Sequence, residues 1–163
     1  MNRVAVCATA LAASFGLAAL ASADIVHLRA IMNGPNEVPG PGDPDGTGVA
    51  DLFIDTAATP NPSVNWIFTA QNIALPLTGA HIHQAPAGVA GGIVVDFNSQ
   101  FTGFGLQDPD LNNVLANPAG FYVNLHNSPF PSGAIRGQLA LVPAPGAAAL
   151  LLLGGAAAAR RRR

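Results

Sequence analysis

The chain has a single cysteine, Cys7, and it lies in an apolar stretch close to the N-terminus. The rest of the chain therefore contains no disulfide, no thiolate ligand for a metal and no cysteine nucleophile. A domain that follows Cys7 must be held together by its apolar core alone.

Lysine is absent, and arginine is scarce away from the two ends. Between Asp24 and Pro143 the only cations are Arg29 and Arg136, whereas all nine acidic residues lie there. Nucleic acids and anionic lipids require clustered cations. We therefore predict no nucleic-acid partner for this part of the chain.

Familiar catalytic motifs are also missing. Glu37 is the only glutamate, and no serine stands in a pattern typical of a nucleophile elbow. Asp43-Pro44-Asp45-Gly46 begins like a calcium loop but lacks the later acidic ligands and the closing glutamate, which favours a simple turn. We predict that the protein is not an enzyme.

The N-terminal segment has the three parts of a secretory signal peptide. Arg3 is followed by the uncharged, apolar Val4–Leu20 and by Ala21-Ser22-Ala23, a pattern that signal peptidase cleaves. A membrane anchor is the alternative, but the apolar stretch is short and ends in a cleavage pattern. We predict a signal peptide over residues 1–23, so that the mature protein begins at Asp24.

The C-terminal segment contains a second uncharged stretch, Leu139–Ala159, which Arg160–Arg163 follow directly. Pro143 and Pro145 interrupt its beginning and leave Gly146–Ala159 as an apolar helix, whose basic end stays in the cytoplasm. With Ala144 in place of the usual glutamate, the segment resembles a variant PEP-CTERM sorting tail.

This resemblance covers residues 142–163 and implies a bacterial protein processed by an exosortase-type enzyme. With the signal peptide it predicts export to the cell envelope or the extracellular space through a transient, membrane-anchored intermediate. A permanent tail anchor is the alternative.

Between the two ends, apolar and polar residues alternate in short runs that are separated by turns rich in glycine, proline, asparagine and aspartate. Such a pattern is typical of an antiparallel β-sandwich or Greek-key barrel. We predict one all-β domain over residues 24–141 and an apolar helix at each terminus of the chain. About seven strands are expected, in the runs Val26–Met32, Ala50–Asp55, Val64–Gln71, Ala80–His83, Ile93–Phe97, Phe121–His126 and Ile135–Leu141.

One segment departs from this alternation. Asp108 and Pro109 are suited to the start of a helix, and Leu111, Val114 and Leu115 have helical spacing. We predict a short helix there.

Three motifs resemble the CHRD domain, a family named for chordin. They are the segment Asn33–Pro39, the segment Gly79–Gly88, which contains Ala-His-Ile-His, and the segment Tyr122–Leu139, which contains Tyr-Val-Asn-Leu-His and Ile-Arg-Gly-Gln-Leu. Ala134 and Asn127 depart from the pattern, because the family commonly has glutamate and threonine there. The resemblance implies a β-sandwich domain of surface or extracellular proteins, which here would be a binding or structural module with an unknown extracellular partner.

Strand alternation predicts a shared polar face on three of these runs. His81 and His83 oppose the apolar Ala80 and Ile82, and the later runs contribute further polar residues on their non-core side. The expected members of this face are His81, His83, Tyr122, Asn124, His126, Arg136 and Gln138.

Three interpretations of this face remain open. His81, His83 and His126 are candidate ligands for zinc or copper, because an i, i+2 pair lies about 6.5–7 Å apart on one strand face. The His-x-His pattern is similar to that of copper/zinc superoxide dismutases, but their other ligands and disulfide are missing. Alternatively, the histidines join a structural polar cluster of Glu37, Asn124, Arg136 and Gln138 that holds the loops by hydrogen bonds, with Glu37 as a partner of Arg136. Binding of another ligand is the third interpretation.

Overall fold

The computed structural model describes residues 25–143. The predicted signal peptide, its cleavage site and nearly all of the predicted sorting segment, including both terminal apolar helices, lie outside these residues. Among the described residues, no helix combines the length and apolar character needed to span a membrane.

The described chain folds into one sheet of nine strands with a short α-helix and two single-turn 3₁₀ helices. The helices are η1 (Gly34–Asn36), α1 (Leu111–Ala116) and η2 (Pro118–Gly120). The strands are β1 (Ile25–Asn33), β2 (Thr47–Asp55), β3 (Ser63–Gln71), β4 (Leu77–Gln84), β5 (Gly92–Asp96), β6 (Thr102–Gln107), β7 (Phe121–Asn127), β8 (Ile135–Gln138) and β9 (Ala140–Leu141).

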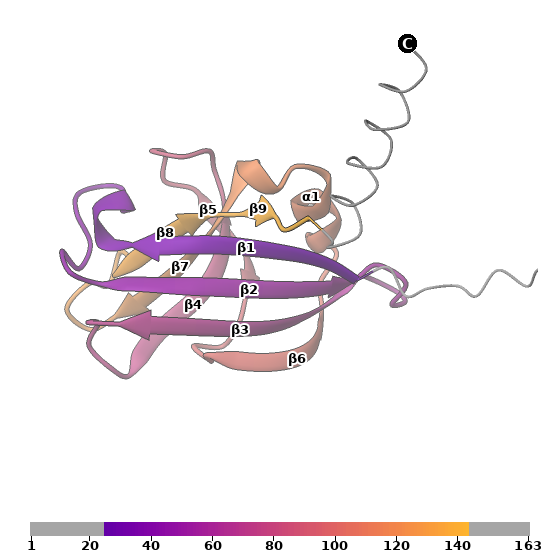
Figure 1. Ribbon diagram of the computed structural model, residues 1–163, viewed down its shortest axis with the longest axis horizontal. Helices are drawn as coiled ribbons and strands as arrows, with labels where there is room; N and C mark the ends of the chain where they lie inside the picture. Colours follow the sequence, from indigo (N-terminus) through magenta and orange to yellow (C-terminus); the bar gives the residue numbers. More distant parts are fainter. Residues whose placement is uncertain (1–24, 144–163) are drawn as a thin grey trace, which may run out of the picture.

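The sheet is antiparallel and runs in the order β5-β4-β7-β8-β1-β2-β3-β6, with β9 paired to β1 beside β8. In Figure 1, β1, β2 and β3 lie across the front and β4, β5 and β7 pass behind them. One sheet therefore curls into a half-barrel around its core. The prediction of an all-β, antiparallel domain is confirmed, although its strands form one continuous sheet.

The core lies on the concave side of this sheet, where the predicted alternation holds. Leu28, Leu52 and Ile82 are fully buried, each on its predicted face. Trp66 packs against Phe97 in a tilted arrangement, with ring centroids 4.9 Å apart, and so joins β3 to the residue that follows β5 across the core. Such burial supplies the main stabilisation of a domain that has no disulfide.

The predicted number of about seven strands is too low, since the described residues form nine. The predicted run Ile135–Leu141 is divided into β8 and β9, and Leu141 is 61% exposed although the alternation placed it in the core. Strand β6 was not predicted, because its side chains are mostly exposed and its glycines interrupt any apolar pattern. It pairs with the backbone of β3 at one edge of the sheet.

The helix predicted after Asp108 is confirmed as α1, with Leu111 and Val114 buried. It begins later than the sequence suggested, because Asp108 and Pro109 form a turn before it. The Asp108 carboxylate accepts a hydrogen bond from the Asp110 amide at 2.8 Å, which closes that turn.

Candidate functional site

The three strands that carry the predicted polar face are neighbours in the sheet, in the order β4-β7-β8. Their register sets His81 opposite Asn124 and His83 opposite Tyr122 on β7. On the next strand, Arg136 lies opposite Asn124. Since cross-strand partners point to the same side of a sheet, the polar residues of all three strands share one face, here called the outer face.

The outer face is covered by loops. Asn124 and Arg136 are each 2% exposed and His83 is 7% exposed, although none of them points into the apolar core. The sequence indicated the direction of these side chains, and hydrogen bonds to the loops were one of the three interpretations of this face.

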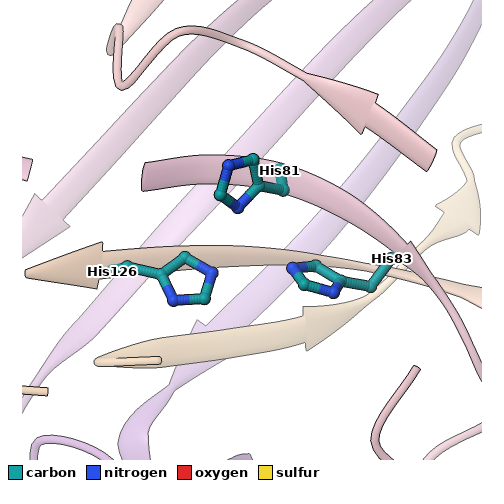
Figure 2. Close-up of side chains that lie close together, drawn as sticks. All are labelled: His81, His83 and His126. Carbon is teal, nitrogen blue, oxygen red and sulfur yellow. The ribbon is translucent and has the colours of Figure 1, made fainter. Parts of the chain in front are cut away.

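His81, His83 and His126 converge on this face (Figure 2). Each offers a ring nitrogen, and these three nitrogens all lie within 4.8 Å of one another. The ring centroids are 5.0 Å apart for His81 and His126 and 5.5 Å apart for His81 and His83. The structure thus brings together the three histidines that strand alternation singled out.

One nitrogen of each ring already has a polar neighbour. His83 Nδ1 lies 3.0 Å from the Gly91 carbonyl oxygen, and His126 Nδ1 lies 3.1 Å from the Pro131 carbonyl oxygen. His81 Nε2 lies 3.6 Å from Asp96 Oδ1, an ion-pair distance rather than a hydrogen bond. Two of the rings therefore tie loops to the sheet.

Burial is the main reason why the pKa of each of the three histidines is lowered from its ordinary value. The charge of His126 lowers the pKa of His81 further, and the charges of His126, His81 and Arg136 act in the same direction on His83. At neutral pH the rings are therefore neutral imidazoles, the form that binds metals.

The remaining polar residues hold loops as well. Arg136 Nη2 donates to the Pro86 carbonyl at 3.0 Å, and Gln138 Nε2 donates to the carbonyls of Ala85 and Ala119, at 2.8 Å each. The Arg136 guanidinium also lies over the Tyr122 ring, 3.4 Å from its centroid. Arg136 and Gln138 thus fasten the segment after β4 to the sheet.

Glu37 contacts a different partner from the one predicted. Its Oε2 accepts a hydrogen bond from Asn124 Nδ2 at 3.3 Å, and its carboxylate makes no direct ion pair with Arg136 among the described residues. Burial raises the Glu37 pKa to about 7, although the charge of Arg136 and the bond from Asn124 both oppose this shift. Arg136 therefore acts on the Glu37 pKa through the electrostatic effect of its charge, without a direct contact.

Two residues near the histidines were not identified from the sequence. Asp96 pairs with His81 across β4 and β5, and it is the only acid in the predicted run Ile93–Phe97, so the register of that hairpin would have revealed it. Gly79 lies beside the rings, where an added Cβ would come within 2.6 Å of His81 Cε1.

His27, the fourth histidine of the chain, lies outside this cluster. His27 Nε2 lies 2.6 Å from Asp51 Oδ1, and the ring stacks on Phe53 with centroids 4.5 Å apart. It provides a control for experiments on the other three histidines.

Comparison with known proteins identifies the family. No curated protein and no solved structure matches the chain. The family model of the CHRD domain matches residues 28–139, which include most of β1, all of β2 to β8 and every residue of the outer face. The chain therefore belongs to the CHRD domain family.

Proposed function

We propose that the protein is an exported, non-enzymatic CHRD module of the cell surface or extracellular matrix, which serves a structural or binding role. Membership of the CHRD family is the observation that carries this proposal, because CHRD domains are typical of secreted and extracellular proteins. The function does not require an ion at the histidines.

The way the domain is stabilised supports the structural or binding role. The core and the buried hydrogen bonds of the outer face hold the fold without any disulfide after Cys7. Arg136, Gln138 and Asn124 fix loops rather than present free functional groups. The outer face therefore suits a rigid module whose loops keep one conformation when a partner binds.

The route of export is part of the same proposal. Signal peptidase would release residues 1–23, and an exosortase-type enzyme would process the segment 142–163 after transient anchoring in the membrane. The sequences of these two segments support it: Ala21-Ser22-Ala23 follows the first apolar stretch, and Arg160–Arg163 follows the second.

Intact-mass analysis of the protein from its native host, after separation of envelope and medium, tests this proposal. We expect the exported form to begin at Asp24 and to lack Arg160–Arg163. Replacement of Ala21 and Ala23 by leucine should block the first cleavage and keep the precursor in the membrane, because signal peptidase requires small residues there. Protein found only in the cytoplasm would contradict export, and exported protein that retains the arginine block would indicate a permanent tail anchor.

A further inference from the structure

The second nitrogen of each clustered histidine is buried and has no hydrogen-bond partner among the described residues. These atoms are His81 Nδ1, His83 Nε2 and His126 Nε2. Buried polar atoms are nearly always paired, since an unpaired one costs about 1–3 kcal/mol. Three such atoms on neighbouring rings therefore call for a ligand that binds all of them.

The hydrogen bonds of the other nitrogens decide what these atoms can bind. A carbonyl oxygen only accepts, so His83 Nδ1 and His126 Nδ1 must carry the protons that reach Gly91 and Pro131. In a neutral ring this leaves Nε2 with a bare lone pair. His81 has the matching arrangement, with Nε2 turned toward the Asp96 carboxylate and Nδ1 free. Lone pairs that face one another repel, and a cation removes that repulsion.

The distances suit a single ion. Three ring nitrogens within 4.8 Å of one another have a common point about 2.8 Å or less from each, and a zinc–nitrogen bond needs about 2.0–2.1 Å. A displacement of each ring nitrogen by less than about 1 Å toward the common point, through rotation of the side chain, closes this gap. Figure 2 shows nitrogens of all three rings turned toward the space between them.

We propose that His81, His83 and His126 form a binding site for one zinc(II) or copper(II) ion. Three imidazoles are a ligand set that both metals accept, and a fourth position is left for water. The carbonyls of Gly91 and Pro131 orient two of the rings, as hydrogen-bond partners of metal-bound histidines do, and the Asp96 carboxylate lies beside the third ring at ion-pair distance. Gly79 leaves the space in which His81 and His126 approach each other.

Titration of the metal-free full chain with zinc(II) alone, and separately with copper(II) alone, tests the site by calorimetry. We expect one ion per chain. His81→Ala should weaken binding by more than about 100-fold, beyond the about 10–100-fold that loss of a group bonded to a ligand costs. This variant keeps both hydrogen bonds from histidine to the loops, so its fold should survive, and circular dichroism checks that it does.

Two further variants separate binding by the cluster from binding elsewhere. His27→Ala should bind the ion as the wild type does, because His27 lies with Asp51 and Phe53 outside the cluster. Gly79→Ala removes no ligand but crowds two of the rings, and should weaken binding by at least about tenfold, comparable with losing a group that orients a ligand.

Failure of both metals to bind the folded wild type would overturn the proposal. Binding that is unchanged in the His81→Ala, His83→Ala double variant would also overturn it, because the ion would then lie elsewhere. Neither result bears on export, which mass analysis tests separately.

Discussion

At the scale of single residues, Glu37 is the clearest case of a group whose ionisation opposes the fold. The carboxyl is 7% exposed, one of its oxygens has no partner among the described residues, and the pKa is raised to about 7 by burial. The folded protein therefore binds a proton more tightly than the unfolded chain does. The stabilisation from this proton is present in full below the unfolded value of 4.5 and is lost as the pH rises through 7.

We predict that Glu37→Gln removes this loss, because an amide stays neutral at every pH. Between pH 5 and pH 8, the free energy of unfolding should fall by about 2–3 kcal/mol more in the wild type than in the variant. The three clustered histidines act in the opposite direction, since their pKa values are lowered, but they are the same in both proteins. Urea unfolding at the two pH values measures the difference. Equal pH dependence in both proteins would show that folding does not raise the pKa of Glu37.

At this scale, the sequence pattern predicted the side of the strand to which a side chain points better than it predicted the hydrogen-bond partner of that side chain. Alternation of apolar and polar residues placed His81, His83 and His126 on one side of their strands, because side chains of a strand alternate strictly. The partner of Glu37 could not be predicted, since it depends on how the loop after η1 packs against Asn124. Spacing along a strand carries no information about that packing.

At the scale of elements, β6 shows why some strands escape detection. Gly103 lies against the Trp66 ring, so a side chain there would overlap the indole, and the strand has no room for an apolar residue at that position. Backbone pairing with β3 holds β6 in place. An edge strand of this kind leaves little trace in the sequence, whereas the runs of β1, β2 and β3 are long and regular.

We predict that Gly103→Ala destabilises the domain by about 1–3 kcal/mol, because the new methyl group must displace Trp66 or β6. Trp66 is 7% exposed, and its indole donates to the Gln100 carbonyl at 3.1 Å, so its fluorescence should report the displacement. Gly92→Ala on the other edge strand is the matched control, since an added Cβ there has nothing within 4 Å. Equal unfolding midpoints for the two variants would contradict this prediction, because they would mean that the Trp66 indole can move without loss of free energy of unfolding.

At the scale of the whole molecule, the fold follows from the apolar core, and the candidate site follows from strand order. The sequence predicted an all-β domain because its apolar residues alternate in strand-length runs. That β4, β7 and β8 are adjacent is a property of long-range pairing, which a single sequence does not encode locally. Because these strands are adjacent, His81, His83 and His126 form a cluster, and hydrogen bonds to loop carbonyls fix the tautomers of His83 and His126.

The proposed site requires that three neutral imidazoles meet on the outer face, each with one bare nitrogen turned toward the others. Long-range proton–nitrogen correlation spectra of the metal-free protein at pH 7.5 test it most directly, with signals assigned through single histidine-to-alanine variants. We predict that His83 and His126 carry their protons on Nδ1 and that His81 carries its proton on Nε2, next to Asp96. A proton on Nε2 of His83 or His126 would contradict the account, because no set of three lone pairs would then remain to share a ligand.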